Sequence, residues 1–202
     1  MSKQGLDQVA SEVVVCTQCI LSKSRVKAVP GEGPANAEIM FIGEGPGFHE
    51  DQQGRPFVGA AGKFLSELLE SIGLKREQVF ITNIVKCRPP SNRDPLPEEI
   101  AACKPYLDRQ IALIKPKVIV TLGRFSMARV FPNEKISVIH GRPKKIEGIV
   151  YVPMYHPAAA LHQRSLKRTV EEDFQKLPQI LDKLDQMQEE RPPDQADQLS
   201  LF

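Results

Sequence analysis

The chain has 202 residues, of which 41% are hydrophobic and 26% are charged, and its formal net charge is +2. This length and composition indicate one soluble globular domain, with or without a tail. They exclude a membrane-spanning protein, because no apolar stretch approaches the ~18 residues that such a helix needs. The first residues (MSKQGLDQVASE) contain no apolar signal region, so we also expect no export.

The charge is unevenly distributed along the chain. Residues 182–202 contain six acids and two bases, which leaves the other 181 residues with a net charge of +6. A basic body with an acidic tail is compatible with binding to nucleic acid. Many enzymes that bind no nucleic acid carry a similar charge, so this pattern alone identifies no partner.

The first half of the chain alternates between helical and strand-like patterns. A short helix is expected over 6–15, and the compact apolar run at 37–42 (AEIMFI) indicates a buried strand that ends in the Gly-rich stretch GEGPG. Residues 63–72 have helical spacing, and Gly73 follows them as a residue that ends a helix. A second strand is expected over 79–85 (VFITNIV).

The second half continues this alternation. A helix is expected over 96–114, a third strand over 117–122 (KVIVTL) and a fourth over 149–154 (IVYVPM). One long helix is then expected over 165–187, disturbed at Pro178 because proline disrupts a helix interior.

Four strands that alternate with helices predict an α/β fold with a mainly parallel sheet covered on both faces. In such folds the site lies at the carboxyl ends of the strands. The segments that follow the strands are 43–51, 83–93, 123–124 and 155–161. Since the first, second and fourth segments hold most of the chemically interesting side chains, we expect the site to be built from them.

The four cysteines form one C-x-x-C pair and two dispersed positions. They are Cys16, Cys19, Cys87 and Cys103. In the absence of an export signal, a metal site or a redox site is favoured over structural disulfides. Four thiolates can hold either a zinc ion or a [4Fe–4S] cluster. Because a structural zinc site usually has two C-x-x-C pairs, the spacing favours the cluster, with zinc and free thiols as alternatives.

Four motifs, taken in order, carry a resemblance to a known family. They are GEGPGFHED (43–51), GRPFVGAAG (54–62), TNIVKCRPP (82–90) and HPAAAL (156–161). Together with the cysteine spacing, they resemble the family 4 uracil-DNA glycosylases, which are the iron–sulfur members of the uracil-DNA glycosylase superfamily. The likeness runs from Cys16 to about residue 180 and covers almost the whole expected domain.

The resemblance implies a three-layer α/β/α sandwich with a central four-stranded parallel sheet, here formed by residues 1–187, and a [4Fe–4S] cluster bound by the four cysteines. It also implies hydrolysis of the N-glycosidic bond of uracil in single- and double-stranded DNA, which leaves an abasic site in base-excision repair. We therefore expect a monomeric, cytoplasmic, nucleoid-associated enzyme that acts on uracil-containing DNA and has no membrane partner.

The motifs contain the groups that this reaction needs. Phe57 offers a flat apolar platform for an extruded base, and the amide of Asn83 can donate to uracil O4 and accept from N3–H. His156 can donate a hydrogen bond to O2, where negative charge develops on the departing uracil. The GEGPG turn is expected to present backbone N–H groups, such as that of Gly45, to the base.

A carboxylate is needed to orient the attacking water and to stabilise the cation-like sugar. The candidates are Glu44, Glu50 and Asp51. The resemblance favours Glu44 and Glu50 equally for this role. It also places Glu44 in the uracil-binding site. The alternative role of Asp51 is to brace its loop, and His49 is expected to face solvent.

Other side chains near the motifs are candidates for contacts outside the base pocket. Leu161, with the residues after it, is a candidate wedge that fills the position vacated by the base, as apolar wedges do in other proteins that distort DNA. The candidate phosphate contacts are Lys86, Arg88, Arg93, Arg142, Arg164 and Arg168. The alternative for each of these is a solvated surface charge.

The C-terminal residues 188–202 are expected to form a flexible acidic tail, because they combine Pro192, Pro193 and several acids. The tail ends in QLSLF, which resembles the peptide by which repair enzymes and polymerases bind the bacterial sliding clamp. The residues of this peptide that would make the contacts are Gln198, Leu199, Leu201 and Phe202. Its apolar side chains have no core of their own, so a groove on a partner would bury them; the alternative is a tail that folds back on the body.

Two other functions remain open at this point. One is a non-catalytic iron–sulfur module that binds DNA and is recruited by the clamp. The other is a related glycosylase that removes other deaminated bases, such as hypoxanthine or xanthine. An assay of base release from a panel of modified oligonucleotides would separate these functions from uracil excision.

Overall fold

The computed structural model describes residues 2–189, and the clamp-like peptide expected at the C-terminus lies outside this range. Five strands form one sheet in the order β2-β1-β3-β5-β4. The strands are β1 (Ile39–Gly43), β2 (Phe80–Asn83), β3 (Val118–Leu122), β4 (Lys144–Ile146) and β5 (Ile149–Met154). The four predicted strands are present and parallel to one another, which confirms the α/β class with its mainly parallel sheet.

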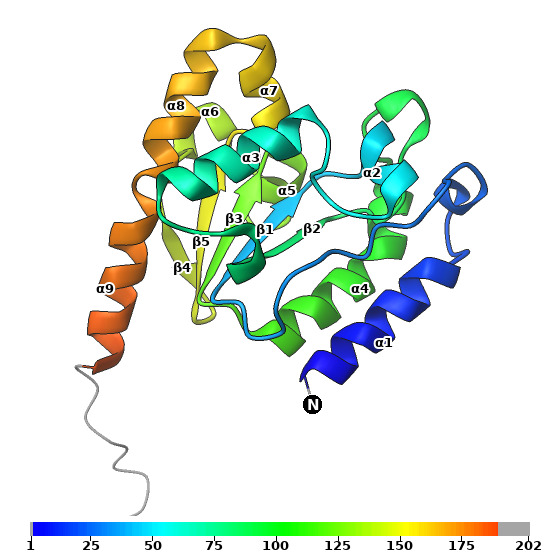
Figure 1. Cartoon of the computed structure of the whole chain (residues 1–202), viewed down its shortest axis with the longest axis horizontal. Coiled ribbons are helices and arrows are strands. Elements are labelled where there is room, and N and C mark those ends of the chain that lie inside the picture. The colour runs from blue at the N-terminus through cyan, green and yellow to red at the C-terminus, as the bar shows by residue number, and fades with distance from the viewer. Residues whose placement is uncertain (1, 190–202) are drawn as a thin grey trace, which may run out of the picture.

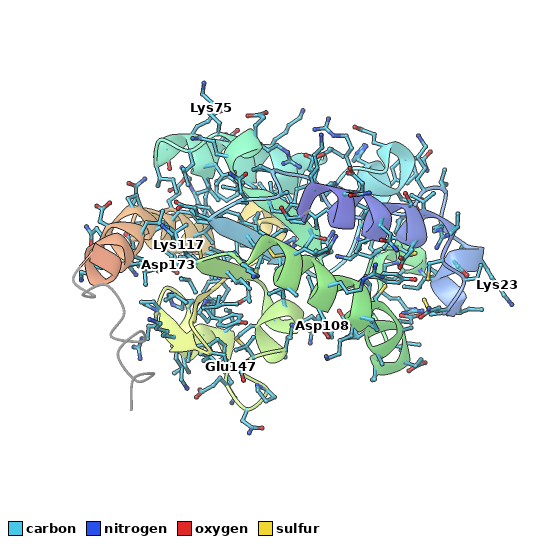
Figure 2. All side chains as sticks on the ribbon, turned by 90° about the horizontal axis from the view of Figure 1, so that it is seen from below. Lys23, Lys75, Asp108, Lys117, Glu147 and Asp173 are labelled. Carbon is cyan, nitrogen blue, oxygen red and sulfur yellow. The ribbon has the colours of Figure 1, made fainter. Side chains whose placement is uncertain are left out.

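The additional strand, β4, pairs antiparallel with β5 at the edge of the sheet. Residues Glu147 and Gly148 join the two strands, both with positive φ (49° and 85°), as a tight hairpin turn requires. The sequence gives little signal for β4, because the strand has three residues and two of them are exposed lysines. The sheet therefore has one short edge strand more than the four that were expected. Glu147, in the turn of this hairpin, is labelled in Figure 2.

Helices cover both faces of the sheet (Figure 1). One face packs against α3 (Ala60–Ser71), α8 (Arg164–Phe174) and α9 (Leu177–Glu189). The other packs against α4 (Pro97–Ile114) and α5 (Arg124–Ala128), and α1 (Ser2–Val15) lies beside α4. The shorter helices are α2 (Phe48–Gln53), α6 (Ile136–Ile139), α7 (Pro157–His162), η1 (Ile20–Lys23), η2 (Arg76–Gln78) and η3 (Pro90–Asn92).

The last helical stretch differs from the expected single helix. It divides into α8 and α9, with a turn at 175–176, and α7 precedes both. Pro178 explains the break, because in a continuous helix its ring would clash with the carbonyl of Phe174 and it has no N–H to donate. As the second residue of α9, the same proline is tolerated. None of the described helices is both long enough and apolar enough to cross a membrane.

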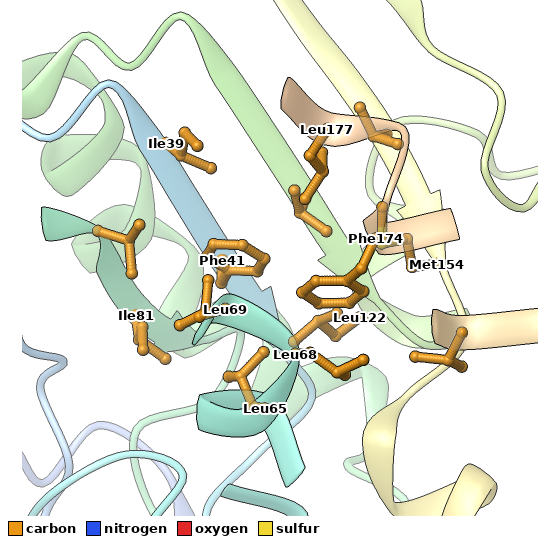
Figure 3. Close-up of a cluster of buried hydrophobic side chains, with 14 of the residues drawn as sticks. Ile39, Phe41, Leu65, Leu68, Leu69, Ile81, Leu122, Met154, Phe174 and Leu177 are labelled. Carbon is orange, nitrogen blue, oxygen red and sulfur yellow. The ribbon is translucent and has the colours of Figure 1, made fainter. Parts of the chain in front are cut away.

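The main core lies between the sheet and the helices on the α3 side (Figure 3). Phe41 of β1 stacks on Phe174 at the end of α8, with ring centroids 5.9 Å apart and planes inclined by 11°. Leu65 and Leu69 of α3 are fully buried against the same sheet face. Because β1 and α3 belong to this core, the loops that leave their ends have a rigid base.

Candidate active site

Loops from the carboxyl ends of β1, β2 and β5 meet around one cavity of about 390 Å³. This is the edge of the sheet at which the sequence predicts the site. The cavity is lined by Glu44, Gly45, Pro46, Gly47, Glu50, Phe57, Ala61, Asn83, Pro89, Asn92, Arg93, His156, Ala158 and Ala159. The expected base platform, amide, histidine and two glutamates are therefore brought together at one cavity.

Phe57 is held in an unusual backbone conformation. Its φ is +52°, in the left-handed region that residues other than glycine seldom adopt. Arg76 donates to the backbone carbonyls of Pro56 and Phe57, the latter at 3.0 Å, and to Glu32 at 2.8 Å. Gly62 allows the turn, since a Cβ there would lie 1.9 Å from the Phe57 carbonyl oxygen. These contacts hold the ring at the cavity wall, and the sequence shows no local sign of the role of Arg76.

His156 lies beside this ring. The two ring centroids are 5.5 Å apart and the ring planes are inclined by 26°. His156 is the N-cap of α7, and its Nδ1 accepts a hydrogen bond of 3.1 Å from the backbone N–H of Ala158. Burial lowers the pKa of His156 to about 4, although Glu50 opposes this shift. The imidazole is therefore neutral at pH 7, and with Nδ1 as acceptor the proton is on Nε2.

Asn83 is the last residue of β2, and it is almost fully buried while lining the cavity. Its Oδ1 is buried and has no hydrogen-bond partner among the described residues. Such an acceptor is unfavourable unless a ligand supplies a donor. Gly43 permits the packing here, because a Cβ at this position would lie 2.4 Å from Asn83 Oδ1 and 2.7 Å from the ring of Phe57.

The two cavity glutamates differ in their partners. Oε1 of Glu50 accepts hydrogen bonds from the backbone N–H groups of Val58 (2.8 Å) and Gly59 (2.9 Å), which joins α2 to the start of α3. Glu44 is half-buried, and burial, followed by the nearby Asp94, raises the pKa of its carboxyl group against the opposing effect of Arg124. Glu50 thus supports the loop, whereas Glu44 has the raised pKa of a group that can take up a proton.

Asp51, the third candidate carboxylate, does not line the cavity. It is 2% exposed, and its Oδ1 accepts a hydrogen bond of 3.0 Å from the backbone N–H of Val26. The bracing role considered for it is therefore the one that its contacts support. Gly45, by contrast, lies at the cavity as expected, and a Cβ there would come within 2.8 Å of Val85.

Lys86 is not a phosphate contact, contrary to expectation. Its side chain is fully buried, and its ammonium donates to Thr82 Oγ1 (2.5 Å), to Gln110 Oε1 (2.7 Å) and to the backbone carbonyl of Asn83 (2.8 Å). Burial lowers the pKa of Lys86 to about 7. The expectation was wrong because the neighbouring residues in sequence look like a basic surface run, whereas the partners of Lys86 come partly from the distant α4.

The arginine candidates for phosphate contacts differ in whether their guanidinium groups are paired with a carboxylate. Arg93 lines the cavity, but its guanidinium is bound by the buried carboxylate of Glu99 at 2.6 and 2.9 Å. Arg168 forms a salt bridge of 2.8 Å with Glu172 on the same helix. Arg142 and Arg164 are exposed and away from the cavity lining, so their contacts with phosphate stay predictions.

Arg88 and Leu161 remain candidates for contacts with DNA outside the cavity, Arg88 with phosphate and Leu161 as a wedge. Arg88 donates a hydrogen bond of 2.7 Å from Nε to Oδ1 of Asn92, which lines the cavity. Asn92 was missed, although it lies within the loop after the second strand that the sequence marks as part of the site. Leu161 is 45% exposed on α7, the helix that begins at His156, so it remains a candidate wedge.

The four cysteines belong to one cluster of side chains at the end of α1. Arg25 donates from Nη1 to Cys87 Sγ (3.1 Å), and the backbone N–H of Lys86 is directed at Cys103 Sγ (3.4 Å). Burial raises the pKa of the Cys87 thiol and brings that of Cys103 to about 11, and coordination to a metal would deprotonate such thiols.

Among the side chains that the structure describes, no three His, Cys, Asp or Glu residues converge closely enough to hold a metal ion. Four cysteine thiolates are the ligand set of either a [4Fe–4S] cluster or a single zinc ion.

Comparisons with known proteins give one matching family model and several similar proteins. Residues 30–181 match the family model described as the uracil DNA glycosylase superfamily. The chain is 51% identical to the type-4 uracil-DNA glycosylase of Sulfurisphaera tokodaii over 87% of this chain and 84% of the relative. It is 52% identical to that of Saccharolobus solfataricus (88% and 87%) and 44% identical to that of Thermotoga maritima (90% and 98%).

Proposed function

The chain belongs to the uracil-DNA glycosylase superfamily, and from this membership we propose that it hydrolyses the N-glycosidic bond of uracil in single- and double-stranded DNA. The products are free uracil and an abasic site, which starts base-excision repair. The observation that carries the proposal is the meeting of Phe57, Asn83 and His156 at one cavity. These are the three groups needed to stack on a base, to read it and to stabilise it as it leaves.

The cavity receives a uracil that has been extruded from the DNA. An enzyme cannot reach the glycosidic bond of a stacked base, so the nucleotide must rotate out of the helix. Phe57 then stacks on the flat ring, and Asn83 accepts from N3–H and donates to O4. The unpartnered Oδ1 of Asn83 supports this assignment, because the uracil N3–H would satisfy it. Cytosine has the reverse donor and acceptor pattern along this edge and is rejected.

His156 stabilises the leaving base. As the bond between N1 and C1′ breaks, the electron pair goes to uracil, and negative charge develops on O2. The neutral imidazole, with its proton on Nε2, donates a hydrogen bond to this oxygen. A fixed donor of this kind contributes about 3–4 kcal/mol to a transition state. The pKa of about 4 supports this role, because the ring keeps the neutral tautomer throughout the neutral pH range.

We propose that Glu44 is the general base that activates the attacking water. As the sugar becomes cation-like, the carboxylate of Glu44 orients a water molecule toward C1′ and accepts its proton while the new C–O bond forms. Its raised pKa supports this assignment, because a carboxyl group with a raised pKa is a better base. Glu50 contributes by holding the loop that carries Phe57, through the N–H groups of Val58 and Gly59.

We also propose that Cys16, Cys19, Cys87 and Cys103 bind a [4Fe–4S] cluster. Cys16 and Cys19 after α1, Cys87 in the loop after β2 and Cys103 on α4 would hold the cluster, which would then join these three segments and have a structural role. The gathering of these residues from three distant segments supports the proposal. Analysis for iron, acid-labile sulfide and zinc, together with visible absorbance of the purified protein, tests it, and stoichiometric zinc without iron would contradict it.

The partners follow from the same proposal. Uracil-containing DNA is the substrate, and we propose that the C-terminal QLSLF binds the bacterial sliding clamp while the enzyme itself is a monomer. The full chain should bind purified clamp, and a variant with both Leu201→Ala and Phe202→Ala should not. Equal binding by both chains would refute the clamp assignment and would leave the glycosylase assignment intact.

The function is tested by incubating the purified chain with an oligonucleotide that contains one uracil. We expect release of free uracil and strand cleavage after alkali, from single strands and from U:G and U:A pairs. Release of thymine at an equal rate would contradict the proposal. DNA binding without any base release would instead favour a non-catalytic module, and release of hypoxanthine or xanthine in preference to uracil would indicate a related glycosylase.

A further inference from the structure

Phe48 is a large aromatic residue that is 53% exposed at the rim of the cavity. It is the first residue of α2 and directly follows Gly47, which lines the cavity. Its ring and that of the neighbouring, exposed His49 are in an edge-to-face arrangement, with centroids 5.5 Å apart and planes inclined by 80°. Much of the surface of the Phe48 ring faces solvent.

Arg88 connects this ring to the cavity. Its guanidinium carbon lies 5.2 Å from the ring centroid of Phe48, which is a cation–π distance, and its Nε donates to Oδ1 of Asn92. Asn92 lines the cavity and has a φ of +54°, and the preceding Ser91 has a φ of +53°. Two successive residues in the left-handed region are strained, and such strain is concentrated at ligand sites. Phe48, Arg88 and Asn92 thus form a continuous edge from the outer surface to the pocket.

We propose that Phe48 and Arg88 form a stacking platform for the nucleobase adjacent to the extruded uracil in the same strand. This inference rests on the proposed function. Rotation of a nucleotide out of a strand leaves one face of the neighbouring base without its stacking partner. An exposed aromatic ring at the pocket rim can supply that partner, and the cationic Arg88 suits the phosphate beside it. The effect is largest in single strands, where no opposite strand holds the neighbouring base in place.

Phe48→Ala tests the platform in steady-state uracil release from a single-stranded oligonucleotide. Stacking of a base on an aromatic residue contributes directly to the binding of single strands, so we expect KM to rise by roughly 5-fold or more. We expect kcat to change little, because Asn83, His156 and Glu44 are unaltered. Phe48→Tyr should retain the parent KM. Val138→Ala is the matched control, since Val138 is also 53% exposed but lies on α6, outside the cavity lining.

A second experiment removes the nucleobase next to uracil instead of the ring of Phe48. Oligonucleotides in which the residue on the 5′ or the 3′ side of uracil is an abasic spacer should raise the KM of the parent chain on one of the two sides. On that side Phe48→Ala should cause no further loss, because the two changes remove the same contact. Additive losses, or a KM for Phe48→Ala equal to that of Val138→Ala, would overturn the platform. If the parent chain released no uracil at all, the proposed function itself would fail, so the two failures are distinguishable.

Discussion

The ammonium of Lys86 donates a hydrogen bond of 2.8 Å to the backbone carbonyl of Asn83, the residue that we assign to uracil recognition. The same ammonium binds Gln110 on α4, and the backbone N–H of Lys86 is directed at Cys103 Sγ on that helix. The end of β2 is thus fixed to α4, a helix that contributes no residue to the cavity lining. Lys86 is therefore a positioning residue, which sets where the Asn83 amide lies.

Lys86→Met should lower kcat more than it raises KM. The variant keeps the volume of the side chain but leaves buried acceptors without a donor, which costs about 1–3 kcal/mol for each group and lets Asn83 shift. A small misplacement of this amide should reduce kcat by roughly 10- to 100-fold. Steady-state kinetics of uracil release, below the unfolding temperature of the variant, measure the effect.

Two controls separate positioning from a general loss of stability. Lys145→Met alters an exposed lysine on β4 and should change neither kcat nor KM. Ile114→Ala, at the buried end of α4 away from the cavity, should lower stability by about 2–5 kcal/mol and keep the parent kcat in the folded state. If Ile114→Ala and Lys86→Met had equal kcat values, Lys86 would be a structural residue only.

The pH dependence of kcat should report the ionisation of Glu44. Burial raises the pKa of this carboxyl group above its ordinary value of 4.5. Because Glu44 must be ionised to accept a proton, kcat should fall as the pH falls through this raised pKa, and it should be constant above it. Glu44→Gln should lose roughly 100-fold or more in kcat and should lack this acidic limb. Glu50→Gln should keep the limb, and an unchanged limb in Glu44→Gln would exclude Glu44 as the base.

The tautomer of His156 can be observed directly by long-range ¹H–¹⁵N NMR. Since its pKa is lowered to about 4 and Nδ1 accepts from Ala158, we expect a neutral ring protonated on Nε2 from pH 5.5 to pH 8. His156→Ala should reduce kcat by about 10²–10³-fold, the typical effect of losing a donor to a developing oxyanion. A proton on Nδ1, or titration near pH 6.5, would contradict the role given to this ring.

Gly62→Ala should displace the base platform, although Gly62 itself does not line the cavity. The new Cβ would lie 1.9 Å from the carbonyl oxygen of Phe57, so the loop must move and carry the ring with it. A displacement of about 1 Å in a group that positions substrate typically costs about 10²-fold in rate. Gly5→Ala on α1, where only the flexible Leu113 side chain is close, is the control with an unchanged rate. Parent-like kinetics for Gly62→Ala would show that the position of Phe57 is not critical.

Local patterns in the sequence predict the sheet and the edge that carries the site, whereas Phe57, Asn83 and His156 were selected within motifs that resemble a known family. Apolar runs mark the four parallel strands, and the polar residues that follow them must converge once the strands are parallel. Lys86 and Arg76 show where this reasoning ends. Each looks like an ordinary surface cation in sequence, and each is defined by distant partners, Gln110 in one case and the carbonyl of Phe57 in the other.

The misjudged elements have similarly physical causes. The edge strand β4 contains exposed lysines and no apolar run, so only its pairing with β5 reveals it. The break between α8 and α9, in contrast, is signalled in the sequence by Pro178. The helix ends four residues before this proline, at Phe174, because the proline ring would clash with the Phe174 carbonyl in a continuous helix.

The most direct test of the account compares uracil release by the parent chain with release by Asn83→Asp. The substituted carboxylate has nearly the same shape but cannot donate to O4, and it places a negative charge beside it. We expect excision of uracil to fall by at least ~100-fold, with the fold and the iron content unchanged. Full activity of Asn83→Asp on uracil would contradict the claim that this side chain reads the base.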